Sequence, residues 1–239
     1  MQPPYRAQAP STALIGPVGG GAGRLYNIGM RTADRDGLRE RWERLCRGLA
    51  TPAHCEQTFQ RLWSAYTAAD RHYHDILHVA DCLRHLDSVR HLAPHPGAIE
   101  WAIWFHDLVY DGTRTDNEER SADQARATLS RLQAEPGLIE QVVELILLTR
   151  HDREPKTRDG ELMVDIDLAS LALPAEQFDE NSRRIRREFS HVAEADFVRG
   201  RAAMLGRFLE RSSIYYTDLF RDRCERAARA NLERVVSGA

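Results

Sequence analysis

Apolar residues recur at three- and four-residue spacing along most of this chain, with Arg and Glu on the opposite face. The pattern covers residues 38–49, 55–66, 76–89, 98–110, 117–133, 138–149 and 197–212. Strand-like alternation is nearly absent, and Pro and Gly fall between the periodic segments, as expected of helix connections. We therefore predict one all-α domain, a helical bundle spanning residues 31–239.

The first thirty residues differ from the rest. They are rich in Gly, Pro and Ala and lack helical periodicity, which predicts a flexible tail over residues 1–30. The run "GPVGGGAGR" lacks the GK[ST] ending of a phosphate loop, so we interpret it as linker. Met30 is expected to lie close to the start of the folded part and is a candidate initiator.

Composition narrows the function classes. The 239 residues are 42% hydrophobic, enough for a sizeable core, and the formal net charge is −3. That balance gives no global attraction to nucleic acid or to a membrane, and no run of about eighteen apolar residues exists to span one. The four cysteines form no CxxC pair. We expect a cytoplasmic protein without disulfides and without a membrane partner, and the charge balance disfavours nucleic acid as a partner.

The polar residues inside the apolar segments suggest chemistry. His74 and His78 are four residues apart, which on a helix places them on one face. His106 and Asp107 are adjacent in the middle of the apolar segment 98–110. A buried carboxylate must be paired or bound to a metal, because desolvating it costs several kcal/mol. The predicted burial of His106 and Asp107 therefore favours a role for them beyond packing.

Two further carboxylates, Asp165 and Asp167, lie in the apolar run "ELMVDIDLASLAL". Imidazole nitrogen and carboxylate oxygen together suit a divalent cation such as Mn, Fe, Co, Ni or Mg. We therefore predict a metal site in the core of the bundle.

The series "YHDILH", "FHD" and "DID" resembles the H…HD…D signature of the HD superfamily of metal-dependent phosphohydrolases, an all-helical fold. The runs "DNEERSA", "LTRHD", "IRREF", "GRAAMLGRFLERSSIYYT" and "ARANLER" are similar to a bacterial branch of predicted HD phosphohydrolases. The resemblance extends from about Arg31 to near the C-terminus.

The resemblance implies that the metal ligands are His78, His106, Asp107 and Asp167. Asp167 is preferred to Asp165 because, in related proteins with a DxD run, the second acid is the ligand. The implied activity is hydrolysis of a small phosphate ester, with nucleotides among the candidate substrates.

The resemblance also implies catalytic roles for two residues. His74 takes the place of a proton-donating histidine, although Asp75 follows it where the related run has Asn. Glu118 would orient the attacking water or bind a second cation through it. In the alternative interpretation Glu118 and Glu119 are acidic residues at a helix start, favoured by the helix dipole, with Asp116 as N-cap.

Arginine and histidine side chains would complete the contacts to phosphate, because the forked donors of arginine match its geometry. The candidates are Arg150, His151 and Arg186. The alternative for Arg186 is a solvated helix face, since it lies in the basic run of residues 183–187.

Two other function classes remain open at this point. An HD-type di-iron oxygenase needs two more histidines between the HD pair and the last aspartate, and this sequence has only His151 there. A non-catalytic metal- or nucleotide-binding regulatory module usually lacks a ligand, and none is missing here. Both are therefore weaker interpretations than a phosphohydrolase.

Overall fold

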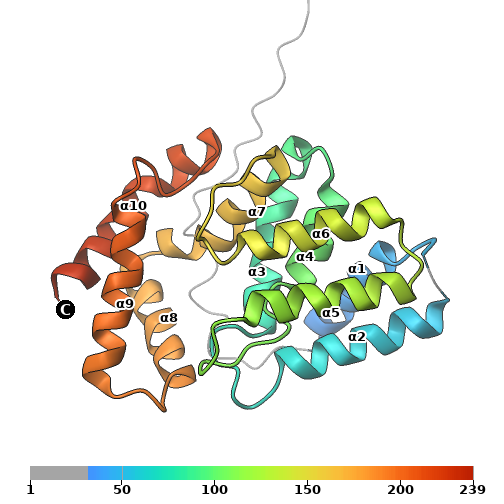
Figure 1. Ribbon diagram of the computed structural model, residues 1–239, viewed down its shortest axis with the longest axis horizontal. Helices are drawn as coiled ribbons and strands as arrows, with labels where there is room; N and C mark the ends of the chain where they lie inside the picture. The colour runs from blue at the N-terminus through green and yellow to red at the C-terminus, as the bar shows by residue number, and fades with distance from the viewer. Residues whose placement is uncertain (1–31, 50, 239) are drawn as a thin grey trace, which may run out of the picture.

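The computed structural model describes residues 32–49 and 51–238, so the tail predicted for residues 1–30 lies outside the described residues. Within those ranges all regular secondary structure is helical (Figure 1), which confirms the all-α prediction. The α-helices are α1 (Thr32–Leu45), α2 (Pro52–Tyr66), α3 (Ile76–Val89), α4 (Pro96–Phe105), α5 (Asn117–Arg131), α6 (Pro136–Leu148), α7 (Arg158–Leu168), α8 (Ala175–Glu188), α9 (Glu194–Leu209) and α10 (Asp218–Ser237), with 3-10 turns η2 (Arg90–Leu92) and η3 (Ala169–Ala172).

Helix α4 is the centre of the bundle. Every residue from Ala98 to Phe105 is buried, and the helix contacts α1, α3, α5, α6 and α7. Helices α5 and α6 lie side by side, while α8, α9 and α10 form a group at one end of the molecule (Figure 1). The 3-10 turn η3 joins the two parts, because it packs against α8 and α10 directly after α7. None of the described helices is long and apolar enough to cross a membrane.

Three tryptophans fix α1 against α4. The Trp42 ring meets the rings of Trp101 and Trp104 edge to face, with centroids 5.0 and 5.5 Å apart. Its indole Nε1 donates a hydrogen bond of 2.8 Å to the carbonyl of Cys55. This contact satisfies the one polar atom of a fully buried side chain.

The sequence pattern predicts His74, His106 and Asp107 within helices, and the structure does not place them there. Helix α3 begins only at Ile76, because the Asp75 carboxylate caps it by accepting the backbone N–H groups of Leu77 and His78. His74 therefore precedes the helix and does not share it with His78. Helix α4 ends at Phe105, so His106 and Asp107 lie at its C-terminal end and not at the centre of a helix.

We predict that Trp42→Ala lowers the free energy of unfolding by about 3–5 kcal/mol, because it leaves a cavity beside two large rings. Urea denaturation measures this change. Trp63→Ala is the matched control, since Trp63 is only half-buried and packs near Arg35. Equal losses in the two variants would show that the three-ring cluster is not a main source of stability.

Candidate metal centre

Side chains from three helices bring nitrogen and oxygen atoms together in the core. The Nε2 atoms of His78 on α3 and His106 after α4 are 3.1 Å apart. Oδ1 of Asp167 on α7 lies 3.1 Å from the first and 3.5 Å from the second. Both imidazoles are buried, so this group of atoms is largely shielded from water.

One hydrogen bond of His106 determines which ring nitrogen can act as a ligand. Its Nδ1 donates to the carbonyl of Ile103 at 2.9 Å. Since a carbonyl can only accept, Nδ1 carries the proton and Nε2 of the neutral ring presents a lone pair. In this neutral state the lone pairs and the carboxylate oxygens repel one another. The repulsion is removed either by a proton, which turns the contacts with Asp107 and Asp167 into hydrogen bonds, or by a cation that lies between the atoms. The arrangement suits a cation.

Asp107 adds a second carboxylate. Its Oδ2 is 3.0 Å from Nε2 of His106 and 3.6 Å from Nε2 of His78. Donors that bind one cation at about 2.1 Å with right-angle geometry lie about 3.0 Å apart. The measured separations therefore fit donors that share one ion.

Cys82 is a member of this cluster that the sequence analysis missed. The donor atoms of His78, Cys82, His106 and Asp167 all lie within 4.8 Å of one another, and these residues can hold a metal ion. Cys82 follows His78 by four residues on α3, so the helical spacing that was applied to the histidines would also have found it.

The neighbouring histidines stabilise the carboxylates of Asp107 and Asp167 in their ionised form. Burial alone would raise the pKa of Asp167, but hydrogen bonds with His106, His151 and His78 hold it well below its usual range. Burial also opposes the low pKa of Asp107, which the charges of the neighbouring histidines produce. Two ionised carboxylates thus face the same point at neutral pH.

Asp165 points to a different partner. Its two oxygens accept the backbone N–H groups of Tyr216 and Thr217 at 2.7 and 2.8 Å, and Thr217 caps the start of α10. Burial raises the pKa of Asp165 to about 6. The structure therefore brings Asp167, and not Asp165, to the cluster.

His74 lies beside the cluster and is oriented by Glu188, the last residue of α8. Oε2 of Glu188 is 2.7 Å from Nδ1 of His74. Its Oε1 accepts the backbone N–H groups of His72, Tyr73 and His74. The Tyr110 ring stacks on His74 with centroids 4.0 Å apart. Glu188 was not predicted as a functional residue, although the run "IRREF" contains it.

Arg71 joins the two loops that carry the site. Its guanidinium donates to the carbonyls of His74, Asp107 and Leu108 at 2.9, 2.7 and 2.8 Å. The loop before α3 and the turn after α4 are therefore held together by one side chain, which was not singled out from the sequence.

His151, another predicted site residue, contacts the cluster, and Glu118 lies in the first turn of α5. Nε2 of His151 is 3.0 Å from Oδ2 of Asp167, and its backbone has a left-handed φ of 58° that is uncommon outside glycine. Arg211 supports this conformation by donating to the carbonyl of His151 at 2.7 Å. Burial and the charge of Asp107 raise the pKa of Glu118.

The two arginines predicted to bind phosphate are engaged with other partners. Arg150 pairs with Glu119 and Asp152. Arg186 pairs with Glu194 at 2.6 Å and donates to two backbone carbonyls in the turn between α8 and α9. For Arg186 the contacts indicate a structural role in that turn, because three carbonyl or carboxylate acceptors already occupy its guanidinium.

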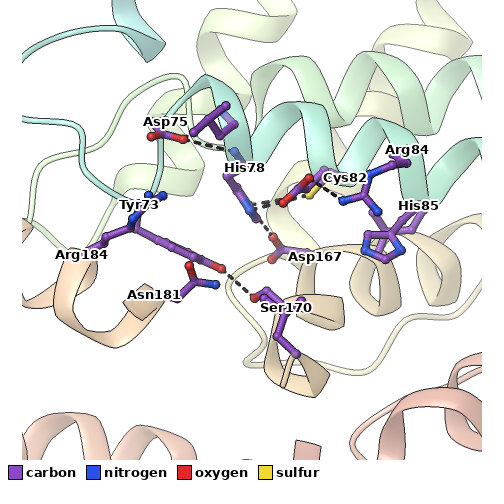
Figure 2. A pocket seen from close by; sticks show the side chains of 14 residues that line it. Tyr73, Asp75, His78, Cys82, Arg84, His85, Asp167, Ser170, Asn181 and Arg184 are labelled. Carbon is purple, nitrogen blue, oxygen red and sulfur yellow. Dashed lines mark hydrogen bonds and ion pairs between the residues drawn. The ribbon is translucent and has the colours of Figure 1, made fainter. Parts of the chain in front are cut away.

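A small cavity opens beside the cluster, with a volume of about 50 Å³. Figure 2 shows His78, Cys82 and Asp167 pointing toward one another, with the hydroxyl groups of Tyr73 and Ser170 hydrogen-bonded nearby. A space of this size admits a few water molecules or one end of a substrate.

Comparisons with models of known protein families, with curated proteins and with solved structures found no match. The site contains three features that could support chemistry: a cluster of donors for a cation, an imidazole paired with a carboxylate, and a small cavity that adjoins the donors.

The two aspartates of the "DID" run give opposite predictions. Asp165→Asn should lower the free energy of unfolding by about 2 kcal/mol, because one charge-assisted acceptor of the α10 loop is lost, and should lower the melting temperature by roughly 4–8 °C. Its metal content should be unchanged. Asp167→Asn should reduce metal content with a smaller effect on melting. Thermal melts and elemental analysis of both variants test this, and an exchange of the two results would reverse the assignment.

Proposed function

We propose that this chain is a metal-dependent hydrolase of phosphate esters, a member of the HD superfamily, in which a divalent cation is bound by His78, His106, Asp107 and Asp167. One observation carries the proposal. Two imidazole nitrogens and two carboxylate oxygens, in the sequence order that the signature has, converge with separations of 3.0–3.6 Å beside a histidine that is paired with a glutamate.

The contacts favour Asp107 over Cys82 as the fourth ligand. A metal bound to an imidazole lies in the ring plane beyond Nε2, so another ligand of that metal is much closer to Nε2 than to Nδ1. Sγ of Cys82 is 3.8 Å from Nε2 and 3.9 Å from Nδ1 of His78. The thiol therefore sits beside the ring, while Oδ2 of Asp107 faces the nitrogens.

A bound divalent cation would lower the pKa of a water and neutralise charge on the phosphoryl oxygens. Mixed nitrogen and oxygen donors suit Mn, Fe, Co, Ni or Mg. The residues of the chain supply the other steps. Glu118, whose pKa is raised by burial and by the charge of Asp107, would accept a hydrogen bond from the attacking water and so orient it.

His74 acts as the proton donor to the leaving oxygen. With Nδ1 held by Glu188 at 2.7 Å, the other ring nitrogen is the one that delivers the proton. Stacking on Tyr110 limits rotation of the ring. Neither His74 nor Glu188 is needed as a ligand, because four donors already face the cation position.

The expected substrate is a small phosphorylated compound, and nucleotides are among the candidates. A screen of the metal-reconstituted protein against a panel of phosphorylated metabolites tests the class directly. Release of inorganic phosphate from none of them would contradict the proposed function, and oxygen consumption with two bound irons would replace it with the oxygenase.

We predict that Asp107→Ala removes bound metal and phosphatase activity together and leaves the helical circular dichroism largely unchanged, because packing of α3, α4 and α7 holds the fold. Asp123→Ala is the matched control, since Asp123 is exposed on α5. Full metal content in Asp107→Ala would contradict the ligand set, and full metal with lost activity would make Asp107 a catalytic group instead.

We predict that His74→Ala retains its metal but loses about 10²–10⁴-fold in kcat on an alkyl phosphate, because a basic alkoxide departs only when it is protonated. On an activated aryl phosphate, whose phenolate leaves unaided, the loss should be much smaller. Glu188→Gln should show the same substrate dependence with a smaller amplitude. Equal losses on both substrates would assign His74 a structural role, and loss of the metal would make it a ligand.

A further inference from the structure

A buried carboxamide faces the cavity beside the candidate metal centre. Asn181 lies on α8, and only 7% of its surface is exposed. It lines the cavity of about 50 Å³ together with His78 and Asp167, two of the proposed metal ligands. Figure 2 shows its side chain reaching from α8 toward the Tyr73 hydroxyl and the cavity. Asn181 and the candidate metal centre therefore border the same space.

No hydrogen bond joins the Asn181 carboxamide to another residue in the part of the chain that the structure describes. The other buried asparagine, Asn231, is 5% exposed, and its Nδ2 donates to the carbonyls of Leu171 and Leu173 at 2.9 and 2.8 Å. Burying an amide without a partner costs free energy, so packing alone favours a leucine of the same shape at position 181. A ligand that bonds to the carboxamide in the cavity would explain why asparagine occupies it.

Two hydroxyl groups and a guanidinium line the same cavity. The hydroxyl oxygens of Tyr73 and Ser170 are 2.7 Å apart. One of them donates to the other, so the second hydroxyl hydrogen is left to donate to a ligand. Arg184, on α8, adds a positive charge to the wall, and its Nε is 3.4 Å from Oε1 of Glu180. Hydrogen-bond donors from α8, from η3 and from the loop before α3 thus surround the space.

Two carboxylates in the cavity wall already have partners. Asp75 accepts the backbone N–H groups of Leu77 and His78, and Asp81 pairs with Arg84 at 2.5 Å. The third is the proposed ligand Asp167. The groups that remain for a ligand are therefore mainly donors, and they favour a ligand that is rich in acceptor oxygens.

The size of the cavity limits the ligand further. A volume of about 50 Å³ holds roughly four water-sized groups, at about 10–15 Å³ for each. A terminal phosphoryl group, which is one phosphorus with three unsubstituted oxygens, matches that number. A sugar or a base is larger. A phosphodiester has only two unsubstituted oxygens and carries a second organic substituent, for which the cavity leaves no room.

We propose that this cavity receives the terminal phosphoryl group of the substrate, with Asn181 and the Tyr73–Ser170 hydroxyl pair as hydrogen-bond donors, so that the substrates are phosphate monoesters and not diesters. Arg184 contributes positive charge to the same wall. The inference rests on the proposed function, because the cavity adjoins the proposed cation position. It also provides contacts to phosphate that the arginines predicted from the sequence, which are paired elsewhere, do not provide.

The first experiment measures phosphate binding without turnover. In thermal melts of the full-length, Mn²⁺-reconstituted protein, inorganic phosphate should raise the melting temperature. Dimethyl phosphate, which carries two methyl substituents, should not. Asn181→Leu, which keeps the shape without polar atoms, should lose most of the rise with phosphate. Elemental analysis checks that the wild type and the variant contain the same amount of metal.

The melts without phosphate separate a binding asparagine from a structural one. Asn181→Leu should melt at the temperature of the wild type or higher, because an unpaired buried amide has been removed. Asn231→Leu is the matched control. It should melt at a lower temperature, because the carbonyls of Leu171 and Leu173 lose their donor.

The second experiment compares 4-nitrophenyl phosphate with bis(4-nitrophenyl) phosphate, a monoester and a diester with the same leaving group. The wild type should prefer the monoester by about a hundredfold or more in kcat/KM, because the diester cannot place three free oxygens among the donors. Asn181→Leu should raise KM for the monoester by about ten- to a hundredfold, the range expected for one charged hydrogen bond. The value of kcat should change less, as expected of a residue that binds the substrate.

Three results would overturn the inference. The first is that phosphate does not stabilise the wild type, and the second is that it stabilises Asn181→Leu equally. The third is a diester that is cleaved as efficiently as the monoester. Asn181→Asp serves if Asn181→Leu does not fold. It keeps the shape and adds a negative charge, so it should abolish the rise with phosphate by repulsion, and a full rise in that variant would also contradict the inference.

The failure of this inference is distinguishable from the failure of the proposed function. If no ester is hydrolysed but phosphate stabilises the wild type and not Asn181→Leu, the phosphoryl site stands and the hydrolase does not. If esters are hydrolysed with the same KM and the same preference in the wild type and in Asn181→Leu, the hydrolase stands and the phosphoryl site does not.

Discussion

The structure depends on one electrostatic constraint: imidazole nitrogens and carboxylate oxygens lie close together in a part of the core that is largely shielded from water. The Nε2 atoms of His78 and His106 face each other and the oxygens of Asp107 and Asp167 at 3.0–3.6 Å, an arrangement that a proton or a shared cation between these atoms stabilises. A core built this way cannot be optimised for packing alone. Helices α3, α4 and α7 must be positioned along their axes so that these side chains meet at one point.

The residues around the candidate metal centre are held in place mainly by hydrogen bonds between side chains and the main chain. Arg71 donates to three carbonyls, Glu188 accepts from three N–H groups, and Asp165 accepts from two. Contacts of this kind fix loops as well as side chains, because they hold the backbone on which the side chain is mounted. The site is therefore rigid where its residues lie outside helices, as His74 and His151 do.

Much of the fold and part of the site follow from local sequence pattern. Helical periodicity located the helices, and buried charge together with the family resemblance indicated His78, His106, Asp107 and Asp167, which the structure brings together. The errors were also local: a helix was extended through Asp75, whose carboxylate caps the following helix, and another was extended through His106. The pattern of apolar residues reports which side chains share a face, but it does not report where a polar side chain ends the helix.

Arg71 and Glu188 could not be found in this way. The partners of Glu188 and two of the three partners of Arg71 are distant in sequence, and neither residue differs in sequence pattern from an ordinary surface residue. Glu188 lies in a basic run, where arginines drew attention to phosphate binding. Only the packing of α8 against the loop before α3 gives that glutamate its role. Contacts between residues so far apart in sequence depend on how the helices pack, and they produce no periodic pattern in the sequence of either segment.

The bond between Glu188 and His74 joins residues 114 positions apart. Ribosomal synthesis proceeds from the N-terminus, so the proposed metal ligands are all present in the growing chain once α7 has been made. The carboxylate that orients His74 emerges only with the end of α8. A chain interrupted between these two points would contain every proposed ligand and lack the carboxylate that orients His74. If the proposed function holds, the capacity to bind a cation and the capacity to act on a stable ester are therefore completed at different moments of synthesis.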